Sequence, residues 1–440
     1  MRKVLKIFCL VVIGCVALAV VIIFIPSVLN LFSHDTALPD DRDLVLSKAV
    51  VPDAENSYFD LLKLKDGIKG KELDLFNDAL QGKWREEEIK EIIAQNKEAL
   101  AIFDVAANKS QFQDPAIDEP SKILPEAKFL PLGGVRSAGR IAFLRALYDA
   151  RHGQEREALK EVLNILKVGQ QLQNAPIPNF PEYLVGRAVE NIGFEAAQRI
   201  VSMTKLPSAF LVSFNKQLES FSASQEGLKR LFRSNYSAEV NNIDQITQGI
   251  IVSLSEEMPE NKNFIAQRIK ERGFYFQPNA TKVLSANNAR KQIQDTEMPC
   301  ALIKYNEESV SSNSFLHVLR VAKLYVTPNA IGKLLDGVLH GPLTSVQNNR
   351  CEGELLAVST RTLFALRAYK LDKQNLPEML TMLVPKYLSA IPMDPFDGNM
   401  LRYSREKKII YSVGREGRDL GGSSGSDWHT MTNPTFSIPF

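Results

Sequence analysis

The sequence predicts a mostly α-helical protein with an N-terminal transmembrane helix and a small C-terminal α+β module. A long apolar run lies near the N-terminus, and apolar residues recur at helical spacing through the centre of the chain. The last part of the chain combines a helical pattern with two short β-strand patterns. We expect a membrane anchor over 1–32, a linker over 33–57, a helical body over 58–345 and the module over 346–440.

The predicted anchor is the apolar run Ile7–Ile25, which carries no charged residue and is followed by Pro26. A helix needs roughly 20 apolar residues to cross a bilayer. Arg2, Lys3 and Lys6 precede the run, and short basic flanks of this kind stay in the cytoplasm. We therefore expect a single pass through the inner (cytoplasmic) membrane of a bacterium, with the lipid bilayer as a partner and the bulk of the chain in the periplasm.

The same run allows two other interpretations. A cleaved signal peptide has an apolar core of about 7–15 residues, and this run is too long for it. A lipoprotein signal is the alternative, because Val12-Ile13-Gly14-Cys15 resembles a lipobox with Cys15 as the lipidated residue. The apolar residues that continue after Cys15 favour the transmembrane helix. The transmembrane helix and the lipoprotein signal both place the chain after Phe32 outside the cytoplasm.

Composition excludes two classes of protein. Of the 440 residues 45% are hydrophobic, which is enough to build a core and argues against disorder. Lys and Arg number 53 and Asp and Glu number 51, so the formal net charge is only +2. A chain without a basic excess offers no surface for a polyanion, and we expect no nucleic acid partner.

The central chain reads as a series of helices. The linker 33–57 shows no sustained period, a helical pattern starts at Tyr58, and one longer helix is predicted over about 85–107. The clearest feature is a helical hairpin with arms over about 141–148 and 158–172 and Gly153 at the turn. It resembles one tetratricopeptide hairpin, but the period of about 34 residues is not visible, so an ordinary antiparallel helix pair is favoured.

Further helices are predicted along the rest of the body. One follows Pro181, one begins near Ala280, and another covers about 315–324. Two shorter ones are predicted around 209–221 and 224–232. These patterns make the body α-rich from its beginning to its end.

The sequence shows no recognisable active site. It has no His-Glu-x-x-His, Cys-x-x-Cys, Gly-x-Ser-x-Gly or phosphate-binding glycine loop, and its five histidines are scattered. Two cysteines lie inside the apolar run, which leaves Cys300 and Cys351 in a compartment where disulfides persist. We expect these two residues to form a disulfide, with two buried free thiols as the alternative.

In the C-terminal module, residues that end helices or form turns occur in a distinctive order. A helix containing Tyr369 is followed by Leu376-Pro377, by a short leucine-rich helix and by Pro392-Met393-Asp394-Pro395-Phe396-Asp397-Gly398. Two strands, Met400–Tyr403 and Ile409–Val413, are predicted on either side of a charged turn. A Gly/Ser-rich tail then leads to a last predicted edge strand around Phe436–Ile438.

This order resembles the globular C-terminal part of the major pseudopilin of type II secretion systems, over about seventy residues. The whole chain also resembles uncharacterised membrane-anchored bacterial proteins in which this ending follows a helical region. The resemblance implies a calcium site in the loop after the final Gly-rich turn, to which Asp419 and Asp427 could contribute. Unlike a pseudopilin, this chain separates its apolar run from the module by over three hundred residues, so assembly into a pseudopilus is not implied.

Two functions follow from these observations. The leading one is a non-enzymatic, membrane-anchored scaffold of the envelope that binds an unknown envelope protein, without a cofactor. The alternative is an envelope hydrolase that acts on peptidoglycan or peptides through a dispersed active site. A deep pocket with converging carboxylates or a Ser/His pair would favour the hydrolase, and a broad apolar groove between helices would favour the scaffold.

Overall fold

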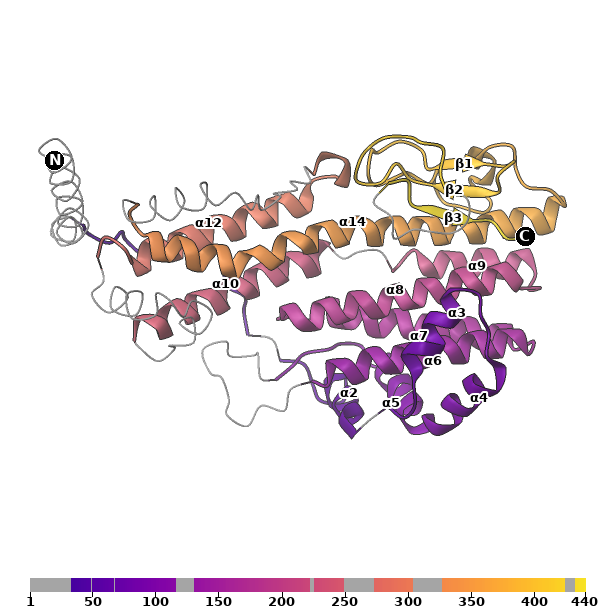
Figure 1. Cartoon of the computed structure of the whole chain (residues 1–440), viewed down its shortest axis with the longest axis horizontal. Coiled ribbons are helices and arrows are strands. Elements are labelled where there is room, and N and C mark those ends of the chain that lie inside the picture. The colour runs from indigo at the N-terminus through magenta and orange to yellow at the C-terminus, as the bar shows by residue number, and fades with distance from the viewer. Residues whose placement is uncertain are drawn as a thin grey trace, which may run out of the picture. The chain divides into compact units, whose positions relative to one another are not determined.

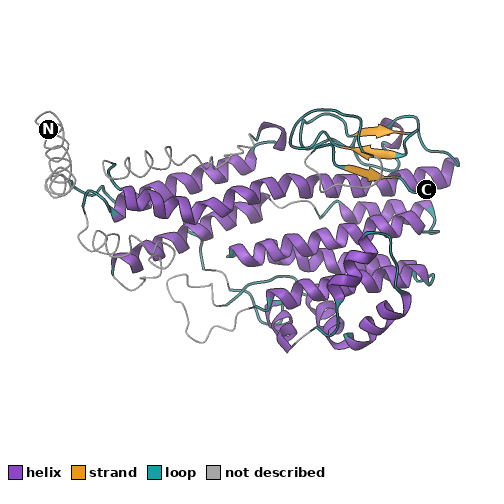
Figure 2. Ribbon diagram, in the orientation of Figure 1, coloured by secondary structure: helices purple, strands orange, loops and turns teal. Residues whose placement is uncertain are grey.

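The computed structural model describes residues 33–48, 50–66, 68–115, 130–221, 225–248, 273–303, 327–423 and 432–440. These residues form mostly helices and one small antiparallel sheet, which confirms the predicted fold class in outline (Figures 1 and 2). None of the helices in these ranges is long and apolar enough to span a bilayer. The predicted anchor Ile7–Ile25 and the alternative lipidation site Cys15 lie outside the described residues.

The chain divides into two compact units, each built from separate segments. Unit 1 comprises Met1–Val45, Tyr236–Lys291 and Asn306–Thr344. Unit 2 comprises Leu46–Asn235, Gln292–Tyr305 and Ser345–Phe440. Unit 2 therefore combines most of the predicted helical body with the whole of the predicted C-terminal module.

Unit 2 begins with short helices: α2 (Tyr58–Leu61), the 3-10 helix η1 (Leu62–Asp66), α3 (Glu72–Leu80), α4 (Glu86–Gln95) and α5 (Lys97–Ala107). The single helix predicted over 85–107 is wrong, because Asn96 separates α4 from α5. The buried Asn96 amide accepts a hydrogen bond from Lys69 N (2.8 Å) and donates one to Lys69 O (2.9 Å). A side chain held this way competes with the helical backbone and ends the helix.

The centre of unit 2 consists of α6 (Leu132–Arg151), α7 (Glu155–Gln173) and α8 (Phe180–Met203), which pack against one another (Figure 1). The predicted hairpin is confirmed, with Gly153 at φ +83° in the turn between its arms. The helix predicted after Pro181 is α8, whose first turn is capped by Asn179, since the Asn179 side chain accepts from Glu182 N at 2.9 Å.

Three glycines let α7 and α8 approach closely, and we call Gly169, Gly186 and Gly193 the glycine seam. A Cβ on Gly169 would lie 2.7 Å from Glu190 N, and one on Gly186 would lie 2.7 Å from Gly169 O. A Cβ on Gly193 would meet Leu166 Cδ2 at the same 2.7 Å. Two of these three obstacles are backbone atoms, so a larger residue at Gly169 or Gly186 would force the helices apart.

The C-terminal part contains a long helix, a short 3-10 helix and three strands: α14 (Ala330–Lys373), η5 (Leu380–Leu383), β1 (Arg402–Ser404), β2 (Ile409–Tyr411) and β3 (Thr435–Ser437). The strands pair antiparallel in the order β1-β2-β3, with Tyr403 opposite Ile410 and Ile410 opposite Phe436. Both predicted strands are confirmed, although each is shorter than its pattern, and the last edge strand is confirmed with a shift of one residue. The predicted boundary between 345 and 346 falls inside α14.

Helix α9 (Ser208–Leu218) joins the C-terminal part of unit 2 to the central helices. The Asn215 amide donates to Arg361 O at 3.1 Å and to Tyr387 O at 3.3 Å. Phe214 packs on Phe364 of α14, with ring centroids 5.1 Å apart. One continuous apolar core therefore contains residues of α6 to α9, of α14 and of the sheet.

Unit 1 is described through α10 (Gln225–Thr247), α12 (Pro278–Glu297) and the first turns of α14, where α10 and α12 also contribute residues to unit 2. The apolar residues of its core are Ile243, Ile246, Phe274, Tyr275, Phe276, Ala330, Ile331 and Leu335. The helix predicted from Ala280 is confirmed as α12. The helix predicted over 315–324 lies outside the described residues.

Candidate functional site

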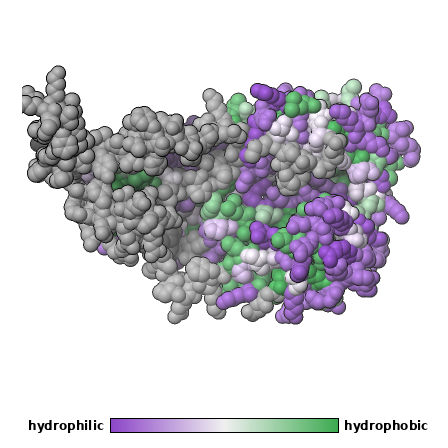
Figure 3. Space-filling view, viewed as in Figure 1, coloured by the Kyte–Doolittle hydropathy of each residue, from purple (hydrophilic) through white to green (hydrophobic). Residues whose placement is uncertain are grey.

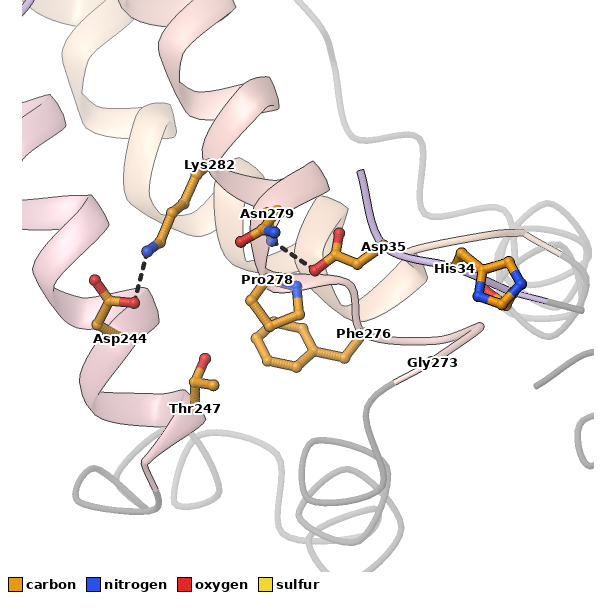
Figure 4. A pocket seen from close by; sticks show the side chains of 10 residues that line it. His34, Asp35, Asp244, Thr247, Gly273, Phe276, Pro278, Asn279 and Lys282 are labelled. Atoms are coloured by element: carbon orange, nitrogen blue, oxygen red, sulfur yellow. Dashed lines mark hydrogen bonds and ion pairs between the residues drawn. The ribbon is translucent and has the colours of Figure 1, made fainter. Parts of the chain in front are cut away.

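Unit 1 contains a pocket of about 500 Å³, a size typical of sites for small ligands (Figure 4). Its walls come from 33–35, from Asp244 and Thr247 at the end of α10, and from the segment 273–282. The sequence predicts no site residue here, because the three segments are far apart in the chain and none of them contains a recognisable motif.

An ion pair forms one end of the pocket. Lys282 Nζ donates to Asp244 Oδ1 at 2.6 Å, and the two side chains point toward each other in Figure 4. Lys282 is buried, with 9% of its surface exposed, whereas the Asp244 side chain is 45% exposed. Among the described residues, Asp244 Oδ1 is the sole partner of Lys282 Nζ, and Asp244 Oδ2 accepts no hydrogen bond.

The N-terminus of α12 forms another part of the wall and is already occupied by a carboxylate. Asp35 Oδ2 accepts from Asn279 N and Asp35 Oδ1 from Ala280 N, both at 2.9 Å. The negative charge of Asp35 therefore sits on the positive end of the helix dipole. The contact also fixes the segment around Ser33, whose hydroxyl accepts from Gln277 Nε2 at 2.6 Å.

Two apolar rings pack beside the charged groups of the pocket. The rings of Phe276 and Pro278 lie between the Lys282–Asp244 pair and the side chain of Asp35 in Figure 4. Phe276 is fully buried, since 0% of its surface is exposed. Besides Asp35 at the helix N-terminus, the pocket thus has one cation and one anion side by side, Lys282 and Asp244, next to these rings.

The structure describes one of the two predicted calcium ligands. Asp419 Oδ1 accepts from Gly421 N at 2.9 Å, and Asp419 Oδ2 lies 3.7 Å from Arg402 Nε. Asp427 lies outside the described residues. Within the described ranges, no group of three or more His, Cys, Asp or Glu side chains is arranged to hold a metal ion.

A partly buried arginine–aspartate cluster lies beside Asp419. Arg402 bonds to Asp394 at 2.7 Å and to Asp397, and its guanidinium holds the pKa of Asp397 at about 2, below the ordinary value. Asp394 is fully buried and also accepts from Ser412 Oγ (2.7 Å) and from the backbone N–H groups of Phe396 and Val413 (3.0 Å each). Asp394 thereby connects the Pro-x-Asp-Pro turn to the strands, a structural role that explains why the motif contains an aspartate.

The two cysteines expected to pair are joined in the structure. Cys300 and Cys351 form a disulfide with Cα atoms 5.7 Å apart, and both residues are buried. Nearby, Arg350 Nη2 donates to Met298 O at 2.8 Å and Arg350 Nη1 to Glu354 at 3.1 Å. The disulfide and the arginine together fasten the segment around Cys300 to α14.

Sequence reasoning missed a pair of buried acids in unit 2. Glu182 at the start of α8 hydrogen-bonds the Asp114 side chain, and both residues are buried. Burial, together with the neighbouring Asp114 carboxyl, raises the pKa of Glu182 well above its ordinary value, so the pair holds a proton at neutral pH. No sequence signal would have found it, because the two residues are 68 positions apart and form no motif.

Exposed large apolar side chains are frequent in one stretch of the sequence of unit 2. On the face drawn in Figure 3, hydrophilic residues cover much of the described surface, and hydrophobic residues show as separate areas among them. Among the described residues, six of the thirteen exposed large hydrophobic residues fall between 379 and 420: Met379, Met382, Ile391, Met393, Met400 and Leu420. We call these six residues the methionine set.

Comparison of the chain with protein-family models, with curated proteins and with solved structures finds no match.

Proposed function

We propose that the chain is a membrane-anchored periplasmic scaffold that binds another protein of the bacterial envelope through its C-terminal module. The observation that carries the proposal is the methionine set. Exposed methionines are flexible and polarisable, and they are typical of surfaces that adapt to a protein partner. Among the described residues, every exposed methionine belongs to this set.

The local structure supports a surface that is prepared for binding. Met393 and Met400 lie opposite each other in an isolated antiparallel bridge, and they are 48% and 42% exposed. A backbone hydrogen bond next to the bridge holds it in place, because the N–H of Asp394 donates to Asn399 O at 2.7 Å. A rigid turn therefore presents two adjacent methionines to solvent. The pseudopilin-like order of elements favours a partner from a secretion or pilus-type system.

Site-specific photo-cross-linking in intact envelopes tests this proposal. A cross-linking residue at Met393 should capture one discrete protein, whereas the same residue at Leu73 of α3, which is 44% exposed, should not. Met400→Glu should abolish the captured species without lowering the amount of the chain, because a charge beside Met393 opposes burial of the surface. The same species captured from both positions would contradict the proposal.

The second candidate is the envelope hydrolase, and the Glu182–Asp114 pair favours it. A carboxyl kept protonated beside a second carboxyl can act as a general acid at neutral pH. One oxygen of Glu182, Oε2, is buried without a hydrogen-bond partner among the described residues. Peptidoglycan and peptide hydrolysis by the purified chain, lost in Glu182→Gln, would establish this function, and absence of both activities in the parent would remove it.

The calcium site stays a proposal. Asp419 and Asp427 would supply part of the six to eight oxygen ligands that calcium takes, and Arg402 lies close enough to Asp419 to oppose a cation there. If calcium binds, the full chain should melt at a higher temperature in millimolar calcium than in chelator. Replacement of both aspartates by alanine should remove that difference, and equal melting of the parent in both buffers would exclude the site.

A further inference from the structure

We propose that the pocket of unit 1 binds a phosphoethanolamine group, that is, a phosphate diester joined through two methylene groups to a primary ammonium. The placement of this ligand at a lipid surface rests on the membrane anchoring proposed above. The chemistry of recognition does not, because it follows from the side chains of the pocket alone.

The charges of the pocket select a ligand without net charge. Lys282 and Asp244 cancel each other, and the charge of Asp35 is directed at the N-terminus of α12. A ligand with a large net charge of either sign would meet one of the carboxylates or the ammonium unfavourably. A zwitterion can instead lie antiparallel to the Lys282–Asp244 pair, so that each of its charges faces the opposite charge of the protein.

The hydrogen-bonding groups that remain open match the two ends of this ligand. Lys282 Nζ has three N–H donors, and Asp244 Oδ1 is its partner for one of them among the described residues, so two can reach a phosphate oxygen. Asp244 Oδ2 can accept from the ammonium of the ligand. A trimethylated ammonium has no N–H group and cannot make that bond, so the site should distinguish ethanolamine from choline.

The apolar wall fits the part of the ligand between its charges. Pro278 lines the pocket next to the ion pair and to the buried ring of Phe276 in Figure 4, so the two methylene groups would lie beside an apolar part of the wall. The pocket also begins at Ser33, eight residues after the end of the apolar run at Ile25. Eight residues span at most about 28 Å when extended. A membrane-embedded run would therefore keep the pocket within reach of lipid headgroups.

Calorimetric titration of the full chain in nonionic detergent tests the recognition step. Glycerophosphoethanolamine, the soluble form of the headgroup, should bind at one site, and glycerophosphocholine should bind at least about tenfold more weakly, since a charge-assisted hydrogen bond is lost. Glycerophosphoglycerol, an anion without an ammonium, should also bind weakly. Equal affinity for the ethanolamine and choline compounds, or no binding of the ethanolamine compound, would overturn the proposal.

Two variants and a matched control assign the binding to the pocket. Lys282→Met and Asp244→Asn should each weaken binding at least about tenfold. Lys386→Met should leave it unchanged, because the Lys386–Asp372 pair has the same 2.6 Å separation but belongs to unit 2. Asp244→Asn keeps the shape of the side chain, so it remains informative if Lys282→Met fails to fold. Unchanged affinity in Asp244→Asn would refute the site.

A photoreactive phosphatidylethanolamine, used with the full chain in phosphatidylcholine nanodiscs, separates the two sources of the ligand. Labelling of peptides from 33–35 or 273–282 would identify the lipid headgroup. Binding of the soluble compound without labelling by the lipid would identify a free phosphodiester, while the chemistry of the site would stand. Neither result depends on the methionine set, so failure of this proposal and failure of the scaffold proposal are distinguishable.

Discussion

Replacing Gly186 by alanine should destabilise unit 2 through the glycine seam. The added Cβ would lie 2.7 Å from Gly169 O and 2.8 Å from Leu172 Cβ, and real Cβ atoms essentially never come within 3.0 Å of another heavy atom. Overpacking of a core costs about 1–3 kcal/mol, and the cost should lie in the upper part of this range because backbone atoms of α7 cannot rotate away. The better helix propensity of alanine offsets about 1 kcal/mol. We expect a net loss of about 2 kcal/mol.

Urea unfolding of the full chain, followed by far-UV circular dichroism, measures this loss. For the roughly 300 residues of unit 2, 2 kcal/mol corresponds to a fall of about 3 °C in melting temperature. Gly133→Ala in the first turn of α6 is the control, because a Cβ there meets no atom within 4 Å. It should leave stability unchanged or raise it by up to about 1 kcal/mol. Equal stability of the two variants would show that close approach does not explain the seam.

Three further outcomes are expected. Burial raises the pKa of Glu161 from 4.5 to about 7, so the folded state binds this proton more tightly than the unfolded state and stability falls as pH rises from about 4.5 to 7. Glu161→Gln should remove this slope and should be up to about 3 kcal/mol more stable than the parent at pH 8, with no difference at pH 4; urea titrations at both values check it. Reduction, or Cys300→Ser with Cys351→Ser, should lower stability by roughly 4 kcal/mol, because the bond closes a 51-residue separation. Labelling of both thiols by an alkylating agent in unreduced, denatured protein would exclude the bond. Asp394→Asn should lower the free energy of unfolding by about 3 kcal/mol, because Arg402 loses its buried, charged partner. A melting temperature equal to that of the parent would refute this role.

Elements with strong local signals could be predicted from the sequence. The hairpin of α6 and α7 follows from apolar spacing on both arms and from a glycine at the turn, and both features act within a few residues. The strands β1 and β2 follow in the same way from their spacing on either side of a charged turn. The disulfide could be predicted because only Cys300 and Cys351 lie outside the apolar run, and the run itself led us to expect an oxidising compartment.

Features that depend on distant contacts could not be predicted. Asn96 ends α4 through the backbone of Lys69, so the apolar pattern continues across a break that it cannot reveal. Helix α14 passes through Pro342, a residue that usually ends or kinks a helix, so its full length has no local signal. The pocket depends on Asp35 capping a helix that begins more than 240 residues later, and local capping rules do not reach that far.

The segmented construction of unit 2 has a consequence for how the chain folds as it is made. Its central helices are synthesised early, but the carbonyl groups that Asn215 binds and the ring that Phe214 packs on belong to the last segment. In a nascent chain, the apolar face of α9 therefore stays exposed until nearly all of the protein has been synthesised. The disulfide of Cys300 likewise cannot form before Cys351 has been synthesised. Such late long-range contacts slow folding and extend the time during which the chain can aggregate. Loss of even the last hundred residues would leave the early helices without their cover, so the tail of this protein is required for the integrity of its beginning.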